Sequence, residues 1–299
     1  MRPLLLLAIL CLAACGDPRP AAAVRIERDV PYAGTSPAQR LDLYLPAGAG
    51  PHPLIISIHG GAFRFGDKAD GQVEPMLAGL ERGFAVASIN YRLSGEARFP
   101  AQIQDVKAAI RFLRAHAAEY GVDPHRFAVW GGSAGGHLAC LAGTTGGVRV
   151  WDVPDMPHAA LDDRVQAVVA WFPPLDFASM DAQLRASGSG TPDHDAADSP
   201  ESRLLGGPVP TVTELARQAA PATWLTTDDP AFLLQHGTAD ALVPVQQSQV
   251  FTNQARAILG TAAVTFETLP GAGHGDRAFT TAANVAQVLD HLERVLGPP

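Results

Sequence analysis

Short apolar runs recur along this chain and alternate with segments of helical periodicity. The runs are rich in β-branched and aromatic residues, and they cover residues 54–58, 85–89, 127–130, 165–172, 231–235 and 264–267. Nearly continuous apolar runs are typical of parallel strands that are buried on both faces. Segments 103–117 and 285–296 instead space apolar side chains by three and four positions, which makes one apolar helical face. The alternation predicts an α/β fold with a mostly parallel, doubly wound sheet.

Two stretches depart from this rhythm. Near the start, residues 24–30 and 41–45 alternate apolar and polar residues around a turn at 33–37, which predicts an antiparallel pair at one edge of the sheet. Further on, glycine, proline and aspartate are frequent in residues 178–220 and leave little room for long regular elements. We expect a small insertion over the sheet there. Residues 24–299 then form one domain, because their length suits one large α/β unit and no linker divides them.

The start of the chain has the pattern of an export signal followed by a tether. Residues 1–14 have a basic start, an apolar middle and a small-residue end, and they are too short to span a membrane permanently. Residues 12–15, Leu-Ala-Ala-Cys, resemble the lipobox of bacterial lipoproteins. We expect an exported, periplasm-facing lipoprotein that is anchored through Cys15, with residues 15–23 as tether. A plain signal peptide on a periplasmic or secreted protein is the alternative, and the choice of inner or outer membrane stays open.

Charge and cysteine content narrow the function classes. The formal net charge is -8 and there is no basic run, so the chain lacks the electrostatic footprint of a nucleic-acid binder, and neutral substrates suit it better than polyanions. Hydrophobic residues make up 47% of the chain, enough for a large core. With Cys11 in the leader and Cys15 expected to carry lipid, Cys140 has no disulfide partner. Its apolar neighbours predict a buried, unreactive thiol.

A G-x-S-x-G motif at residues 131–135 stands between the apolar run 127–130 and a helical segment. This is the context in which the motif forms a nucleophile elbow. The sharp turn needs residues with little or no Cβ beside the serine, and it presents the hydroxyl at a helix N-terminus, where developing negative charge is favoured. We expect Ser133 to be a catalytic nucleophile; an ordinary glycine turn is the alternative.

Residues 59–62, His-Gly-Gly-Ala, follow the first long apolar run, where lipases and esterases carry an H-G-G-G loop that binds an oxyanion. Alanine replaces the last glycine here. Because the chemistry uses a backbone N–H, alanine is acceptable if its φ is negative. We expect oxyanion donors at Gly61, Ala62 and Ala134, and a structural hydrogen-bonding role for His59.

Two later loops supply an acid and a histidine. Asp240 follows the run 231–235, and His274 lies in a glycine-rich loop after 264–267. The order Ser, Asp, His is that of α/β-hydrolases and differs from the order in the two common serine-protease folds. We expect His274 to act as general base and Asp240 to orient it. Other candidates are less well placed. Asp228 and Asp229 precede a strand, Asp276 follows His274 too closely in sequence, and His236 shares the loop of Asp240.

Six segments together carry a family resemblance. They are HGGA at 59–62, NYRL at 90–93, FPAQIQDV at 99–106, WGGSAGGH at 130–137, HGTAD at 236–240 and GHG at 273–275. In this order they resemble the α/β-hydrolase carboxylesterases related to hormone-sensitive lipase, especially the bacterial feruloyl and acetylxylan esterase-like branch. The resemblance implies about eight strands, a triad of Ser133, Asp240 and His274, hydrolysis of carboxylic esters, and no cofactor or metal. The short, polar insertion departs from the family pattern, so a full lipid-binding cap is not expected.

The sequence thus predicts a serine esterase that acts on a small-molecule ester through an acyl-enzyme, with no nucleic-acid partner. The large apolar residues of the insertion, such as Met180 and Leu215, are too scattered for an apolar helical face, which favours short or compact acyl groups. Two alternatives stay open: a prolyl-oligopeptidase-like peptidase and a non-catalytic binding module on the same fold. The exact acyl and alcohol groups, the oligomeric state and any movement of the insertion also stay open.

Overall fold

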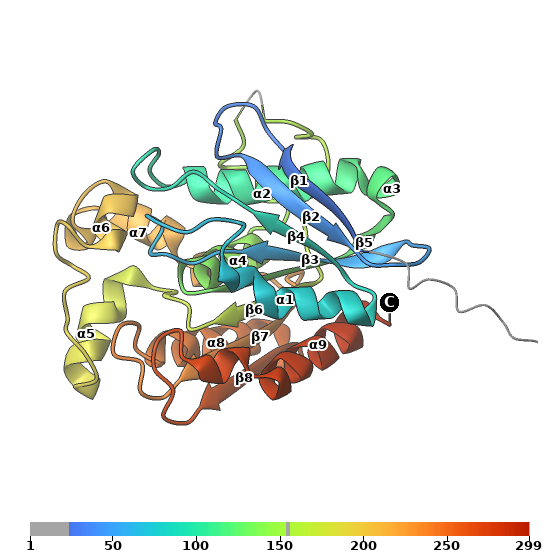
Figure 1. Ribbon diagram of the computed structural model, residues 1–299. Helices are drawn as coiled ribbons and strands as arrows, with labels where there is room; N and C mark the ends of the chain where they lie inside the picture. Colours follow the sequence, from blue (N-terminus) through green and yellow to red (C-terminus); the bar gives the residue numbers. More distant parts are fainter. Residues whose placement is uncertain (1–23, 154–155, 299) are drawn as a thin grey trace, which may run out of the picture.

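The computed structural model describes residues 24–153 and 156–298, and its centre is an eight-stranded sheet (Figure 1). The strand order is β1-β2-β4-β3-β5-β6-β7-β8. β2 pairs antiparallel with β1 and with β4, whereas all other neighbours are parallel. The edge pair and the parallel sheet expected from the sequence are both confirmed. The strands are β1 (Arg25–Pro31), β2 (Arg40–Leu45), β3 (His52–Ile58), β4 (Ala85–Ile89), β5 (Val122–Gly132), β6 (Ala167–Trp171), β7 (Ala231–Gly237) and β8 (Val264–Leu269).

Helices cover both faces of the sheet, which explains why its central strands are apolar throughout. On β3, Leu54 and Ile56 pack into one apolar cluster, and Ile55 between them packs into the other. The first cluster includes side chains of α2, α4 and α8, and the second includes side chains of α1 and α9. The α-helices are α1 (Glu74–Leu77), α2 (Ala101–Ala115), α3 (Ala117–Tyr120), α4 (Ala134–Thr144), α5 (Phe177–Ser187), α6 (Pro200–Leu205), α7 (Thr213–Ala219), α8 (Gln246–Leu259) and α9 (Ala282–Leu296).

The insertion after β6 is more regular than its composition predicts. It contains α5, α6 and α7, which gather at the left of Figure 1. The expectation of little room for long regular elements is wrong for α5, which has 11 residues. The Asp176 side chain accepts the Ala178 N–H at its start, and Gly188 ends it with a φ of 65°. Met180 and Leu184 lie one turn apart and are both buried, so tertiary packing stabilises this helix despite its surroundings.

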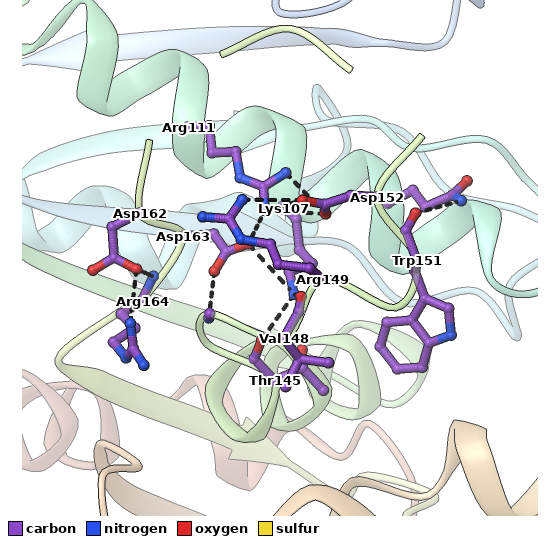
Figure 2. A network of polar contacts seen from close by, with 12 residues as sticks. Lys107, Arg111, Thr145, Val148, Arg149, Trp151, Asp152, Asp162, Asp163 and Arg164 are labelled. Carbon is purple, nitrogen blue, oxygen red and sulfur yellow. Dashed lines mark hydrogen bonds and ion pairs between the residues drawn. The ribbon is translucent and has the colours of Figure 1, made fainter. Parts of the chain in front are cut away.

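A buried ion cluster lies where the chain leaves α4 (Figure 2). Lys107 and Arg111 extend from α2 and are buried, and they meet Asp152 and Asp163 from the segment between α4 and β6. Asp163 also accepts the Gly147 N–H at 2.7 Å. Two cations therefore face two carboxylates, which compensates the cost of taking these charges out of water.

The predicted leader, Cys15 and the tether all lie in residues 1–23, outside the described residues, so these predictions stay predictions. Within the part of the chain that the structure describes, no helix is both long and apolar enough to cross a membrane. Cys140 is buried on α4, and burial raises the pKa of its thiol. The expected burial of this thiol is confirmed.

Candidate active site

Ser133 stands at the turn between β5 and α4. Its φ of 55° and ψ of -123° are unusual for a residue with a Cβ, so the turn is strained as a nucleophile elbow is. A Cβ on Gly131 would come within 2.4 Å of the Gly135 backbone, and a Cβ on Gly135 within 2.0 Å of the Ile58 carbonyl oxygen. Close backbone contacts on both sides of the serine therefore require the two glycines, as the motif predicts.

A chain of hydrogen bonds joins Ser133 to His274 and Asp240, which lie on the loops after β5, β8 and β7. The Nε2 of His274 is 2.9 Å from Ser133 Oγ, and its Nδ1 is 2.8 Å from Asp240 Oδ2. Because the carboxylate can only accept, Nδ1 carries the proton and Nε2 is the nitrogen free to accept the serine hydroxyl. The structure thus brings the three residues singled out by the sequence together at the carboxyl edge of the sheet.

Asp240 is held in place by its own loop and stays ionised. Its side chain is fully buried, and Oδ1 accepts the N–H groups of Leu242 and Val243 at 2.9 Å. Burial by itself would raise the pKa of Asp240, but hydrogen bonds from His236 and His274 outweigh it and hold the pKa well below its usual range. The unprotonated carboxylate can therefore fix the orientation of the imidazole.

The competing candidates have other contacts. Asp276 accepts the N–H of Ala278 at 2.9 Å and caps a short 3₁₀ helix. Asp229 accepts hydrogen bonds within its own turn. His236 is buried beside Asp240, with its Nε2 3.4 Å from Oδ2, so it supports the loop of the acid and does not replace it.

The loop after β3 has three successive residues with positive φ: 108° at Gly61, 54° at Ala62 and 59° at Phe63. The condition set for alanine at this position, a negative φ, is therefore not met. The Gly61 carbonyl oxygen accepts the N–H groups of both Arg64 and Phe65 at 2.9 Å, and this tight turn forces the two residues between into the left-handed region. Successive N–H groups in such a turn point into one concavity, which suits an anion.

Two of the three expected oxyanion donors border the cleft at Ser133. Ala62 and Ala134 line it, whereas Gly61 does not. Ala134 is the first residue of α4, so its N–H has no acceptor within the helix. The loop is braced from behind by Gln72, whose Oε1 accepts the Gly60 N–H at 2.8 Å.

His59 has the structural contacts that the sequence predicts. Its Nδ1 bonds to the Gly60 carbonyl oxygen at 2.8 Å, and its ring stacks on Tyr91 with centroids 4.4 Å apart. Burial lowers the pKa of His59, so the ring is neutral at pH 7. The residue supports the oxyanion loop and does not contact Ser133 or His274 through a hydrogen bond.

The cleft at Ser133 has a volume of about 260 Å³ and a rim that the insertion provides. Asp193 and Asp198 are exposed on this rim, and Pro174 and Val243 line the cleft beside them. The cleft is thus small, with carboxylates at its mouth and apolar side chains on its walls.

A buried histidine links the insertion to the loop that carries Asp240. His194 Nδ1 lies 3.1 Å from a carboxylate oxygen of Glu201, and its Nε2 lies 2.9 Å from the Leu242 carbonyl oxygen. Both partners are acceptors, so both ring nitrogens must donate. Burial by itself lowers the pKa of His194, but the hydrogen bond and charge of Glu201 outweigh it and raise the pKa above its ordinary value. The imidazolium therefore links the insertion to the loop that carries Asp240.

A second hollow, of about 280 Å³, is lined by His274 and is mostly apolar. Phe172 and Phe279 line it, together with Met76 from α1. The ring of Phe172 contacts the imidazole of His274 edge to face, with centroids 4.7 Å apart.

Phe172 and His194 are site residues that the sequence analysis missed. Phe172 directly follows β6, and the carboxyl ends of parallel strands deliver side chains to the site, so its position was a usable signal. His194 gave no such signal, because one of its partners is 48 residues away in sequence.

Comparison with known proteins identifies the family. A family model described as BD-FAE matches residues 41–255, more than half of the chain. The chain belongs to the BD-FAE family. The expected relation to hormone-sensitive-lipase-like esterases and the α/β-hydrolase fold are both confirmed.

Three relatives show how far the likeness of this BD-FAE chain extends. The probable carboxylic ester hydrolase LipM of Mycobacterium tuberculosis is 33% identical over 288 residues, which cover 91% of this chain and 64% of LipM. A bifunctional GH43-CE protein of Bacteroides eggerthii has a TM-score of 0.80 and 35% identity, covering 91% of this chain and 35% of its own. A truncated carbohydrate esterase from gut microbiota has a TM-score of 0.79 and 33% identity, covering 92% and 96%. The chain spans less than two thirds of the length of the curated relatives that match most of it.

Metal ligands are not grouped at this site. Across residues 24–153 and 156–298, no group of three or more histidine, cysteine, aspartate or glutamate side chains could hold a metal ion. The described histidines near Ser133 instead make the hydrogen bonds given above.

Proposed function

We propose that this chain hydrolyses carboxylic esters by covalent catalysis at Ser133. The observation that carries the proposal is the hydrogen-bond chain from Ser133 through His274 to the buried carboxylate of Asp240. Family membership and the names of the relatives, carboxylic ester hydrolase and carbohydrate esterase, support an ester as the bond that is cleaved. A non-catalytic binding module on this fold typically lacks a member of this triad, and here all three are hydrogen-bonded.

Acylation begins when Ser133 Oγ attacks the ester carbonyl carbon and its proton passes to His274 Nε2. The imidazolium that forms is stabilised by Asp240, which already accepts the Nδ1 proton. The carbonyl oxygen becomes an oxyanion, for which the N–H groups of Ala62 and Ala134 are the donors at the cleft. His274 then gives its proton to the alkoxy oxygen, the C–O bond breaks, and the alcohol leaves an acyl group on Ser133.

Deacylation repeats these steps with water as nucleophile. His274 takes a proton from a water molecule, and the hydroxide attacks the acyl carbon. The same N–H groups stabilise the second oxyanion. Its collapse breaks the bond to Ser133 Oγ, which recovers its proton from His274, and the carboxylic acid leaves.

The cleft supports compact acyl groups on a polar alcohol such as a sugar. Its volume of about 260 Å³ lies at the small end of ligand sites, and its rim presents carboxylates that can accept hydrogen bonds from hydroxyls. The apolar side chains that could have formed a lipid-binding surface on the insertion are buried in the core; they are Met180, Leu184, Leu204 and Leu205. A carbohydrate esterase among the similar structures supports the same alcohol.

A series of 4-nitrophenyl esters tests this proposal. We expect catalytic efficiency to be highest for acetyl or butyryl and to fall by about tenfold or more at palmitoyl, which corresponds to about 1.4 kcal/mol of lost transition-state binding. The Ser133→Ala variant is the control for hydrolysis elsewhere on the protein. A steady rise in efficiency up to palmitoyl would show that the insertion opens an apolar groove and would overturn the proposed acyl preference.

We also propose that the chain is exported and held at a membrane through a lipid on Cys15. The support is the apolar run before Ala13-Ala14-Cys15 and the Pro/Ala-rich residues after it. Cys15→Ser should move the protein from the membrane fraction to the soluble one or leave its leader uncut. Unchanged fractionation of this variant would favour a plain signal peptide.

A further inference from the structure

Three arginines gather around a hollow beside the cleft at Ser133. Arg64 comes from the loop after β3, Arg98 precedes α2, and Arg203 comes from α6. The hollow has a volume of about 470 Å³. Its other lining residues are uncharged, and all of them except Phe65 are small. Among the described residues that line it, none is acidic. The hollow is therefore a local concentration of positive charge on a chain whose formal net charge is -8.

None of the three guanidinium groups forms an ion pair within the described part of the chain. Arg203 uses its Nε to donate to the Asp198 carbonyl oxygen at 3.0 Å. Arg64 lies over the ring of Phe65, 5.2 Å from its centroid, and that ring is 63% exposed. Most of the donors of these groups are thus left for another acceptor, whereas Arg92 and Arg111 elsewhere in the molecule are paired with carboxylates.

The elements that hold the arginines are fixed to one another. Phe99, next to Arg98, donates its N–H to the Leu204 carbonyl oxygen of α6 at 2.9 Å. A Cβ on Gly206 would come within 2.6 Å of Arg98 Cδ, so this side chain lies directly against the end of α6. Arg98 and Arg203 are therefore held on adjoining elements, and their charges face one space.

This hollow adjoins the proposed catalytic cleft. The loop after β3 gives Ala62 and Phe63 to the cleft and the next two residues, Arg64 and Phe65, to the hollow. The insertion does the same, because residues 198–201 line the cleft and residues 202–203 line the hollow. A ligand with its ester at Ser133 could extend across this boundary.

Acidic residues close to the hollow in the chain line other spaces. Asp198 and Glu201 line the cleft at Ser133, and Asp67 and Glu96 line a separate hollow to which Arg64 also contributes. Ser94 also lines the hollow, beside the three guanidinium groups. This is a donor-rich surface with forked geometry, which matches a carboxylate or a phosphate better than a neutral group.

We infer that the hollow is a subsite for an anionic group of the alcohol that the ester carries, namely the carboxylate of an acidic sugar. The inference rests on the proposed function and names its substrate class more closely. The net charge of the chain suggests neutral substrates, but at this hollow we expect an anionic group to be preferred. Guanidinium groups would bind the carboxylate bidentately, while Asp193 and Asp198 on the cleft rim would accept hydrogen bonds from sugar hydroxyls.

Binding to the Ser133→Ala protein tests the inference without any need for turnover. The probes are a trisaccharide of galacturonic acid and the matched trisaccharide of galactose, which differ only in having carboxylates or hydroxymethyl groups. We expect calorimetry to give a Kd at least about tenfold lower for the acidic trisaccharide, with the difference shrinking as salt is raised. Equal affinities for the two probes would overturn the inference. So would inorganic phosphate that binds as tightly as the acidic trisaccharide, because the hollow would then be a site for free anions.

Variants assign the effect to the arginines. In the Ser133→Ala background, the double change Arg98→Gln with Arg203→Gln should remove the preference for the acidic probe, and Arg98→Lys with Arg203→Lys should restore part of it. Arg294→Gln, on the exposed side of α9, is the matched loss of charge and should leave the preference intact. A preference that survives the double glutamine change in a folded protein would place the anion elsewhere and contradict the assignment.

Hydrolysis separates this inference from the proposed function. With the wild-type protein, the ratio of kcat/KM for an acetylated acidic oligosaccharide to that for an acetylated neutral one should exceed about ten and fall in the double glutamine variant. If 4-nitrophenyl acetate is hydrolysed but the two oligosaccharides react alike, the esterase proposal stands and the subsite is wrong. If no ester is hydrolysed, the proposed function is wrong, and the binding experiment alone decides whether the hollow recognises an anion.

Discussion

The two ends of α4 are built in opposite ways. At its first turn, Ser133 has a positive φ, its hydroxyl borders a cleft, and the Ala134 N–H has no acceptor within the helix. At its other end, the Lys107 ammonium donates to the carbonyl oxygens of Thr145 and Val148 at 2.7 Å, and the neighbouring charges of Arg111 and Asp163 are paired and buried (Figure 2). The first, open end is strained and borders a cleft, whereas the second, closed end has hydrogen-bonded carbonyl groups and is buried.

The difference shows where this fold can tolerate unpaired polar groups. A helix N-terminus with free N–H groups attracts negative charge, which is useful where an oxyanion develops. A helix C-terminus attracts cations, and Lys107 supplies one from α2. The strained backbone at Ser133 persists because the surrounding structure holds it: α4 is fixed by its buried face and by the ion cluster at its other end.

The largest expected effect is at the open end. Ser133→Ala should lower turnover of 4-nitrophenyl acetate by roughly 10⁴-fold to 10⁶-fold, because the nucleophile is removed and only the oxyanion donors remain. Its free energy of unfolding, measured with urea, should change by less than about 1 kcal/mol, since the hydroxyl is not part of the core.

A companion variant tests the strain at the same residue. Ser133→Gly should be more stable than Ser133→Ala by about 1 kcal/mol, because glycine adopts a positive φ without steric cost. If the alanine variant is the more stable of the two, the backbone at residue 133 is not strained, and the two ends of α4 do not differ in strain.

The next effect concerns the acid that orients His274. Asp240→Asn should lower kcat by about 10²-fold to 10⁴-fold, because the amide can present a donor to Nδ1 and favour the wrong tautomer. Asp276→Asn is the matched control, since its carboxylate caps a 3₁₀ helix, and it should keep kcat within about threefold. The reverse ranking in steady-state kinetics would assign the orienting role to Asp276.

At the closed end, the expected effect is on stability and not on catalysis. Asp163→Asn removes one of two carboxylates that face Lys107 and Arg111, so it should lower the free energy of unfolding by about 3–5 kcal/mol. Asp162→Asn is the control next to it, where an exposed pair with Arg164 should contribute less than about 1 kcal/mol. Urea unfolding at pH 7 measures both, and equal losses would show that the cluster is not a special anchor.

A smaller effect than that of Asp163→Asn depends on pH and concerns His194, which links the insertion to the loop of Asp240. The raised pKa of His194 means that its stabilising pair with Glu201 is fully present below the unfolded pKa of about 6.5 and is lost as pH rises through the folded value. His194→Gln should therefore destabilise the protein by about 1–2 kcal/mol at pH 6 and by less at pH 9.

The control for that variant is His125→Gln, an exposed histidine, which should change the free energy of unfolding by less than about 0.5 kcal/mol at both pH values. A destabilisation by His194→Gln that grows toward pH 9 would contradict the ion pair.

The sequence predicted those features that follow from local pattern. The apolar runs predicted the strands, and the loops that follow strands predicted Ser133, Asp240 and His274, because parallel strands end at one edge of the sheet. The positive φ of Ala62 was not predictable in this way. It follows from hydrogen bonds within the loop, which depend on where the loop is held.

The remaining features depend on contacts between distant segments. α5 forms because Met180 and Leu184 are buried by other elements, and the arginine hollow exists because α6 lies against the residues before α2. Neither arrangement leaves a periodic pattern in the chain. The net charge of the chain suggested neutral substrates, because a net charge does not show where arginine side chains cluster.

The central claim is that Ser133 is the activated nucleophile at the open end of α4, and covalent labelling tests it most directly. An organophosphate fluoride transfers its phosphoryl group to an activated serine hydroxyl and releases fluoride, which leaves a stable ester. We expect mass spectrometry to find one phosphoryl group per chain, on the peptide that contains Ser133, and none on the Ser133→Ala protein. A label on another residue, or an unlabelled wild-type protein under conditions that label a known serine esterase, would contradict the account.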